Sequence, residues 1–583
     1  MKTKHLVLAA ALLAGGLPAT AQKKHAGEMT LDSKEAAANF TSRGYSPYAD
    51  RAYPTRPMWG DTHLHTANSP DAFAFGNRLN PEQAYRFARG ETVTSATGQR
   101  VSLSRPLDFL VVADHGVAMG AMMELYEGNP ELLKDERLKR WHLMMNESPE
   151  QGVKAAGELI SAGSQGDIPP AMLDPRIART VWTSYTKTAE EYNDPGRFTA
   201  LIGYEWTSLV KGNNLHRVVI FRGDRSKADQ ILPFTFADST DPEDLWDFME
   251  NYEKKTGDFA LAIPHNGNLS NGMMFMPETM SGKPFDKAYA ERRARLEPVY
   301  EITQIKGDGE THPLLSPNDE FADYETWDSG NLDLSQKKED QMLQYEYVRE
   351  ALKNGLALKA KLGVNPFKFG VLGSTDSHTS LVAVEEENFF GKHTGKEPSD
   401  HRWNTPVLAT PAGNVMGWEQ ASSGLAAVWA VENTRESIWD AINRREVYGT
   451  TGSRIAVRFW GGWEFEEADA SRRIPAETGY SKGVPMGGDL SKAPAGKAPS
   501  FLVAAMKDPL SGNLDRIQII KGWLDADGET HEKVYDVAWS DADTRTPGAD
   551  GKVPPVGNTV DVPNATWTNT IGDPALMTVW KDP

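Results

Sequence analysis

The sequence contains no cysteine in 583 residues. This absence excludes disulfide bonds, thiolate zinc sites, iron–sulfur clusters and a cysteine nucleophile, so any metal site must use His, Asp and Glu. Positive charge is also in deficit, with a formal net charge of −19 at pH 7. Because binding to a nucleic-acid backbone needs a basic surface, no nucleic-acid polymer is expected as a partner. A small anionic substrate, met by local cations, remains compatible with this charge.

Apolar runs long enough to cross a membrane are lacking too. Two lysines precede an apolar stretch at 6–17, and Ala19-Thr20-Ala21 fits the small-x-small rule for cleavage. Pro18 and the glycines before it make the stretch too short for a transmembrane anchor. We predict a signal peptide over residues 1–21, and hence a periplasmic or secreted protein with no membrane span after cleavage.

What the sequence does contain is a series of apolar runs that end in polar residues. The run at 107–113 leads into Asp114-His115, the run at 198–204 into Glu205, the run at 259–263 into His265, and the run at 369–374 into Asp376 and His378. In the segment 58–65, a strand period of two places Asp61, His63 and His65 on one face. Buried strands that alternate with helices and carry polar residues at their carboxyl ends predict a parallel (β/α) barrel.

The chain can be divided by its composition. Residues 22–56 form a polar leader, 57–452 hold the expected barrel, and 453–583 alternate short strands with Gly- and Pro-rich turns. A polar, helical-looking insertion interrupts the barrel at about 116–197. Within the barrel, Asn80-Pro81-Glu82-Gln83 predicts a helix start with an Asn cap and a Pro at the first position.

The positions of the histidines give the strongest indication of a functional site. Six of the 13 histidines lie at strand ends or in acid–His pairs: His63, His65, His115, His216, His265 and His378. A lone histidine of this kind is usually a hydrogen-bonded structural residue. A set that converges on one rim of a barrel, together with carboxylates, instead binds divalent first-row metals, and carboxylates can bridge two such ions.

The order of these residues resembles the PHP superfamily, named for polymerase and histidinol phosphatase domains. The resemblance covers roughly residues 57–452, and the opening Trp-Gly-Asp-Thr-His-Leu-His resembles a secreted bacterial subfamily of unassigned function. It implies an α/β fold, a distorted (β/α)7 TIM-like barrel with a helical insertion, followed here by a C-terminal all-β region. It also implies a centre of two or three divalent ions.

The resemblance assigns the ligands residue by residue. His63, His65, Glu205 and Asp376 would hold one ion, and Glu205 would bridge to a second ion held by His216 and His265. His115 and His378 belong to a third site, where the family has another histidine; Asp71 is the nearest candidate here, which favours Mn²⁺ or Fe²⁺ over Zn²⁺. Within this set, Glu205, Asp376 and His378 are the predicted catalytic residues. Asp61 and Asp114 are predicted to orient ligand imidazoles.

These residues predict a metal-dependent hydrolase. A water shared by two ions would provide a metal-bound hydroxide, and the resemblance favours a phosphoester substrate. Asn266, Lys306 and Arg454 are candidate contacts to a small anionic ester. The same centre could instead hydrolyse a sulfate ester, a phosphonate ester or an amide. A third alternative is a non-catalytic scaffold with a structural metal, although such a site is usually closed by four protein ligands.

Overall fold

The computed structural model describes residues 53–382, 384–385, 388–395, 397–410, 413–420 and 423–583. The predicted signal peptide, and nearly all of the leader, lie outside these residues. The largest sheet has seven strands in the order β16-β15-β1-β4-β5-β8-β9. Their bounds are Met58–Leu64 (β1), Phe109–Val112 (β4), Thr199–Trp206 (β5), Arg217–Phe221 (β8), Ala260–Pro264 (β9), Leu425–Val428 (β15) and Val447–Thr450 (β16).

A second sheet of three strands lies against the first. Its order is β11-β10-β12, and its strands are Val299–Gln304 (β10), Gly307–Asp308 (β11) and Gly370–Gly373 (β12). Inward-facing apolar side chains of both sheets pack into one buried cluster with helix α13 (Arg435–Asn443). The backbones of the two sheets meet through isolated bridges, Leu64 with Ser377 and His265 with Glu301.

The predicted distorted (β/α)7 TIM-like barrel is therefore wrong, because the strands do not form one closed, parallel ring. Among the strand pairs of these two sheets in the described chain, β1–β4, β4–β5 and β10–β12 are parallel, whereas β1–β15, β15–β16, β5–β8, β8–β9 and β10–β11 are antiparallel. For the β5–β8 pair the cause is chain length. Residues 207–216 are too few for a parallel crossover, which needs a dozen or more residues, so the chain turns back on itself.

Helices cover the outer face of the large sheet. Apolar residues of α3, α7, α9 and α10 pack on it in the main hydrophobic cluster, which residues of α12 also join. Helix α3 has the predicted start, because the Asn80 side chain accepts from the Gln83 amide and the Gln83 side chain accepts from the Asn80 amide. The α-helices described between β1 and β12, including those that do not lie on this face, have the following bounds: Pro70–Ala74 (α2), Pro81–Ala88 (α3), Ala121–Tyr126 (α4), Glu136–Glu147 (α5), Pro149–Ser164 (α6), Pro175–Tyr192 (α7), Arg225–Ala228 (α8), Pro242–Thr256 (α9), Lys287–Leu296 (α10), Asp340–Leu343 (α11) and Val348–Leu362 (α12).

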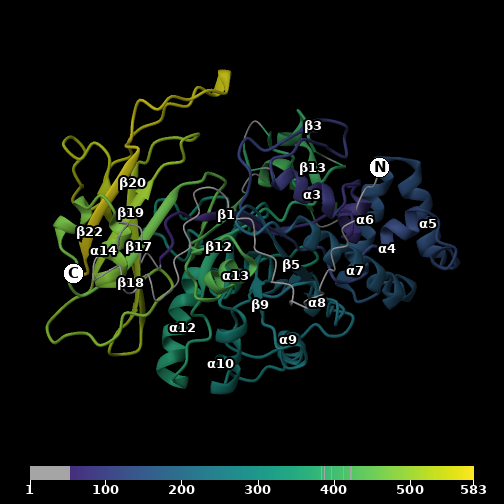
Figure 1. Ribbon diagram of the computed structural model, residues 1–583, viewed down its shortest axis with the longest axis horizontal. Helices are drawn as coiled ribbons and strands as arrows, with labels where there is room; N and C mark the ends of the chain where they lie inside the picture. The colour runs from purple at the N-terminus through teal and green to yellow at the C-terminus, as the bar shows by residue number, and fades with distance from the viewer. Residues whose placement is uncertain (1–52, 383, 386–387, 396, 411–412, 421–422) are drawn as a thin grey trace, which may run out of the picture. The chain divides into compact units, whose positions relative to one another are not determined.

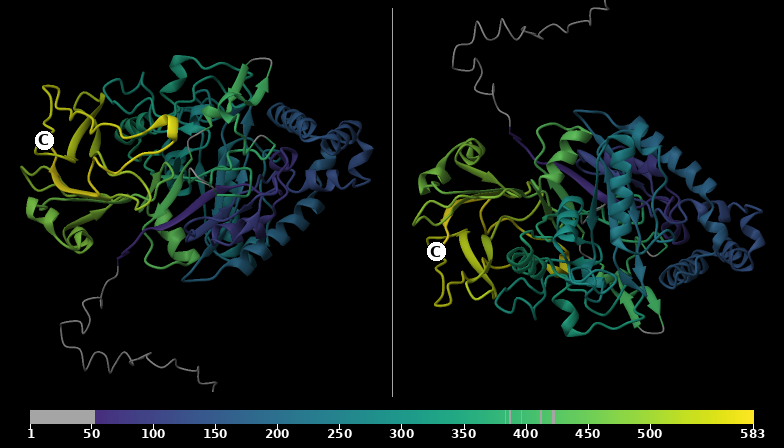
Figure 2. Two further views of the ribbon diagram at one scale, coloured as in Figure 1. Left: turned by 90° about the horizontal axis from the view of Figure 1, so that it is seen from above. Right: turned by 90° about the horizontal axis from the view of Figure 1, so that it is seen from below.

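Two further groups of elements flank the sheets. Helices α4 to α7 lie together on one side, and the C-terminal strands lie on the opposite side (Figures 1 and 2). The C-terminal strands form a four-stranded antiparallel sheet, β18-β17-β19-β22, and a hairpin, β20-β21, that packs on α12. This part of the chain also contains helix α14, so it is not all-β. Its elements are Ala456–Gly462 (β17), Pro475–Lys482 (α14), Gly483–Pro485 (β18), Ser500–Met506 (β19), Arg516–Leu524 (β20), Thr530–Trp539 (β21) and Ala575–Lys581 (β22).

Three short hairpins complete the described chain, and one of them, β13-β14, reaches the site described below. They are Val93–Thr94 with Arg100–Val101 (β2-β3), Leu209–Val210 with Asn213–Asn214 (β6-β7), and Pro406–Thr410 with Gly413–Met416 (β13-β14). Over the residues that the structure describes, none of the helices has the length and apolar character needed to cross a membrane.

Candidate metal centre

The end of β1 brings two histidines together in the interior. His63 and His65 are both fully buried, and their Nε2 atoms lie 3.0 Å apart. The Nδ1 atom of His63 lies 3.1 Å from the carboxylate of Glu301, which can only accept a hydrogen bond while it is ionised, so Nδ1 carries a proton. Nε2 of each ring then faces the other, and two ring nitrogens at this distance require a proton or a metal ion between them.

A chain of hydrogen bonds fixes the tautomer of His65. The Ser69 hydroxyl donates to Asp114 Oδ1 over 2.8 Å, so it has no second proton and must accept from Nδ1 of His65, also at 2.8 Å. Asp114 is held in turn by the amide and hydroxyl of Thr66. The structure therefore places Asp114 behind the imidazole of His65, acting through Ser69 rather than by direct contact. This arrangement leaves Nε2 of His65 as the atom that faces the centre.

Glu205, at the end of β5, lies in the middle of the histidines. Its Oε1 is 2.6 Å from His216 Nδ1 and 2.9 Å from His265 Nε2, and its Oε2 is 2.7 Å from His115 Nδ1 and 3.4 Å from His65 Nε2. Despite this crowding, Glu205 Oε2 and both ring nitrogens of His216 have no hydrogen-bond partner of acceptable geometry within the described chain. These atoms are close to one another but are not aimed at one another, as expected of ligands aimed at a common cation.

Asp376 follows β12 in a left-handed backbone conformation, with φ of 50°. Its Oδ1 lies 3.3 Å from His65 Nε2 and 3.6 Å from His63 Nε2. The amino groups of Lys306 and Lys392 both contact the same carboxylate, Lys392 at 2.5 Å from Oδ1. Backbone strain of this kind persists where the surrounding contacts enforce it, and it is concentrated at functional sites.

Asp71, on the short helix α2, joins the two remaining histidines. Its Oδ2 is 3.0 Å from His378 Nε2, and its Oδ1 is 3.4 Å from His115 Nε2. The structure thus brings Asp71 to the place next to His115 and His378 that the sequence left open.

The buried carboxylates and imidazoles shift one another's pKa values. Burial would lower the pKa of His63, but Asp376 and Glu301 raise it to about 10; burial is likewise outweighed at His115, where Glu205 and Asp71 raise the pKa to about 10. Burial lowers the pKa of His216 to about 4, despite the neighbouring Glu205. Although burial alone would raise it, the pKa of Glu205 is held well below its usual range by His115 and His216. The carboxylates therefore favour a positive charge at these positions, which either a protonated imidazole or a bound metal ion would provide.

The donor atoms form four overlapping groups, in each of which they lie within 4.8 Å of one another. The groups are His65 with His115 and His378; His63 with His65 and Asp376; His63 with His265 and Glu301; and Glu205 with His216 and His265. Imidazole and carboxylate donors of this number suit divalent first-row metals. Because His63, His65 and His265 each belong to two groups, ions bound there would be close neighbours. The residues present fit a metal centre.

Comparison with known proteins places the chain in a family. A family model described as "Protein of unknown function (DUF3604)" matches residues 52–583. The chain belongs to the DUF3604 family. One solved structure similar to this DUF3604 protein is a two-domain protein from Bacteroides vulgatus that contains a predicted PHP-like metal-dependent phosphoesterase. The two share 9% identity at a TM-score of 0.29, over 82% of this chain and 84% of that one. No curated protein matches the sequence.

Three further residues of this DUF3604 protein were predicted to orient ligands or to bind substrate, and they differ in their distance from the centre. Asp61 is hydrogen-bonded to backbone amides and a hydroxyl: it accepts from the amides of His63 and Thr375 and from the Thr375 hydroxyl, which ties β1 to the segment after β12. Asn266 lies next to the centre and accepts from the Gln304 side chain. Arg454 does not reach the centre, since its guanidinium donates to the backbone carbonyls of Arg105 and Pro106.

Sequence reasoning missed Glu301, Lys392 and His393. Glu301 lies in the middle of β10, where a single charged residue among apolar neighbours signals an inward-facing acid. Lys392 and His393 lie in a long loop without periodicity, and no pattern in the sequence pointed to them. His393 stacks on Phe75, with ring centroids 3.9 Å apart, and its Nδ1 has no hydrogen-bond partner within the described residues. Burial lowers the pKa of Lys392 to about 7 despite its contact with Asp376.

Proposed function

We propose that the protein is a metal-dependent hydrolase that cleaves phosphoesters. The observation that carries this proposal is the overlap of the ligand groups through shared histidines, with His65 common to two of them, because ions bound so close together can act on one water and one substrate. Divalent ions bound there would lower the pKa of a water toward about 7 and would neutralise charge on the ester. The order of the ligands along the sequence, which resembles the PHP superfamily, supports a phosphoester as the substrate.

The chain itself provides the remaining functions of such a site. Glu301, Ser69 and the Asp114 carboxylate hold the imidazoles of β1 in a fixed orientation. Lys306 and Lys392 place two amino groups next to Asp376, where an anionic ester can be held by charge-assisted hydrogen bonds. Asp376 contacts the amino groups of Lys306 and Lys392 and also lies next to the imidazoles of His63 and His65, so it connects the proposed anion site to the proposed metal ligands.

The test combines metal analysis with a substrate screen. We expect at least two equivalents of Mn, Zn or Fe per chain by elemental analysis, and hydrolysis of phosphate monoesters or diesters. His63→Ala and Asp376→Ala should each lose metal and activity. His531→Ala is a matched control, because His531 lies on β21 and pairs with Asp525; it should keep both properties.

Other results would change the assignment. Fewer than one tightly bound metal per chain, with no effect of His63→Ala on metal content, would refute the metal centre. Turnover of sulfate esters, phosphonate esters or amides without turnover of phosphoesters would reassign the substrate. Full metal occupancy without any hydrolysis would favour the scaffold alternative.

We also propose that the protein acts outside the cytoplasm. The residue pattern at 1–21 supports this proposal. Cell fractionation of the native producer, together with N-terminal sequencing of the mature chain, tests it; a cytoplasmic chain that retains residues 1–21 would refute it.

A further inference from the structure

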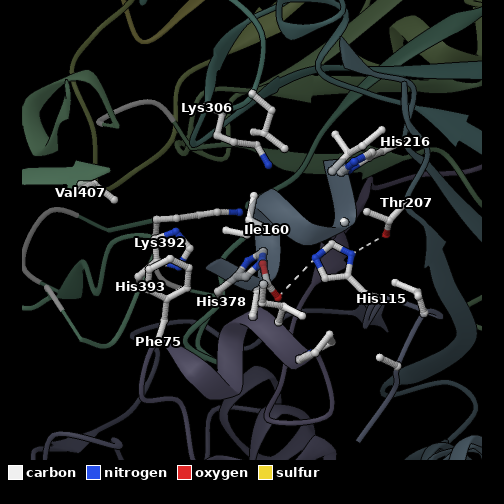
Figure 3. A pocket seen from close by; sticks show the side chains of 18 of the residues that line it. Phe75, His115, Ile160, Thr207, His216, Lys306, His378, Lys392, His393 and Val407 are labelled. Carbon is white, nitrogen blue, oxygen red and sulfur yellow. Dashed lines mark hydrogen bonds and ion pairs between the residues drawn. The ribbon is translucent and has the colours of Figure 1, made fainter. Parts of the chain in front are cut away.

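A cavity of about 130 Å³ lies directly against the candidate metal centre. One side of the cavity is polar. It is lined by Asp71, His115, His216 and His378, and by the amino-group ends of Lys306 and Lys392, which reach toward the imidazoles in Figure 3. This side can receive an anionic group, because two amino groups, those of Lys306 and Lys392, meet a single carboxylate there, that of Asp376, and can donate hydrogen bonds to an anion.

Most of the remaining cavity wall is apolar, with Thr207, His393 and Gln420 as its polar residues, and much of its apolar surface comes from two separate clusters. Leu159 and Ile160 on α6, with Phe236, belong to the cluster of the helices α4 to α6. Trp327, Leu332 and Val415 belong to a small cluster built from the 327–334 segment and β14. Both clusters line the same cavity without joining into one core. The apolar surface between them is therefore available to a ligand.

The size and chemistry of this wall limit what it can hold. An apolar cavity of about 150 Å³ accommodates a benzene molecule, and the present volume of about 130 Å³ includes the polar side, so the apolar part of a ligand is limited to one ring or a short alkyl chain. Lys306, Lys392 and the neighbouring imidazoles lie on the polar side. Away from them, the described lining offers only the side chains of Thr207, His393 and Gln420 to the several hydroxyls of a sugar or a glycerol. A polar substrate would lose hydration there without regaining hydrogen bonds.

We propose that the substrate is an anionic ester of an apolar alcohol, an aryl or short alkyl phosphate, with its anion at Lys306 and Lys392 and its apolar part between the two clusters. This inference rests on the proposed function and specifies its substrate class. In the reaction, a bond forms between the water oxygen and phosphorus, and the bond between phosphorus and the alcohol oxygen breaks. The alcohol oxygen takes a proton from the water. The products are the free alcohol or phenol and inorganic phosphate.

Binding of inert analogues tests the apolar subsite separately from catalysis. Methyl-, ethyl- and propylphosphonate carry the same anion on a phosphorus–carbon bond that phosphoester hydrolysis does not break, and calorimetry on the metal-loaded protein gives their Kd values. Each added CH2 group should lower Kd about fourfold, as burial of one methylene predicts. Propylphosphonate should then bind about 16-fold more tightly than methylphosphonate, and phenylphosphonate more tightly still.

Two variants and a control locate the effect. Ile160→Asp, and the milder Ile160→Ser, should flatten the dependence of Kd on chain length while they leave metal content unchanged. Leu143→Asp is the matched control, since it makes the same kind of change on helix α5 at an exposed residue that does not line the cavity; it should preserve the dependence.

The outcomes separate the two proposals. Kd values that do not fall with chain length, or no measurable binding of any of the phosphonates, would overturn the substrate class even if phosphoesters are hydrolysed. A fourfold gain per methylene without hydrolysis of any phosphoester would support the apolar subsite and refute the proposed function. Retention of the full dependence in Ile160→Asp would place the apolar contact elsewhere and overturn the assignment.

Discussion

The most informative perturbation of the centre is Glu301→Gln. Glu301 is buried in β10, and its carboxylate oxygens lie 3.1 and 3.2 Å from Nδ1 of His63. Gln keeps the shape and one acceptor but loses the charge. Hydrogen bonds to charged groups contribute about 1.5–3 kcal/mol and neutral ones about 0.5–1.5 kcal/mol, so the change should weaken the hold on His63 by roughly 1–2 kcal/mol. This corresponds to a loss of about 5- to 30-fold in metal affinity, in the range expected for carboxylates that orient a ligand imidazole.

Metal affinity can be measured by competition with a chromogenic chelator at fixed pH. Glu297→Gln is the matched control, because Glu297 is another buried carboxylate but pairs with Arg217 and Trp246 outside the centre. It should lower thermal stability without changing metal affinity. If Glu301→Gln keeps its metal affinity within twofold of the wild type, or if Glu297→Gln loses as much, the role given to Glu301 is refuted.

Three further predictions concern protons and stability. Because Asp376 and Glu205, among other carboxylates, hold the pKa values of His63 and His115 near 10 against the effect of burial, metal binding at pH 7 should release about two protons; calorimetry in buffers of different ionisation enthalpy measures this number, and zero release would contradict it. Arg454→Ala should lower stability by about 1–3 kcal/mol through two lost hydrogen bonds to carbonyls, visible as a lower Tm, with unchanged metal content; loss of metal would show that Arg454 supports the centre. Burial raises the pKa of Asp308 to about 8, so the folded state favours its protonated form and loses stability as pH rises from about 4 to about 8; Asp308→Asn should reduce the fall in Tm between pH 5 and pH 8, and an identical fall in both proteins would refute this.

Part of this architecture could be predicted from the sequence. The start of α3, with its Asn80 cap and Pro81 at the first position, depends only on neighbouring residues, and it forms as expected. The histidines and carboxylates at strand ends also converge as the alternation of apolar runs and polar residues suggested. In both cases the feature depends on residues that are close together in the sequence: the first turn of a helix, or a polar residue directly after a strand.

The rest depends on contacts between distant parts of the chain. The turn between β5 and β8 is short enough to indicate an antiparallel pair, but the antiparallel pairing of β15 with β1 joins residues more than 300 positions apart and leaves no local pattern. Lys392 contacts Asp376 from a loop without regular structure. Asp114 acts on His65 through Ser69, which only the three-dimensional hydrogen-bond geometry reveals.

The isolated bridges between the two sheets have a consequence for the order of folding. Leu64 meets Ser377, and His265 meets Glu301, so the sheets join next to the residues that would hold metal. The donors of the centre run from His63 to His378, and no partly folded chain that lacks β10 and the segment after β12 can assemble them. Closing such long loops is slow, so the complete centre should form late. Full metal loading would then mark chains that have finished folding, and a chain stalled with its sheets apart would remain recognisable by its low metal content.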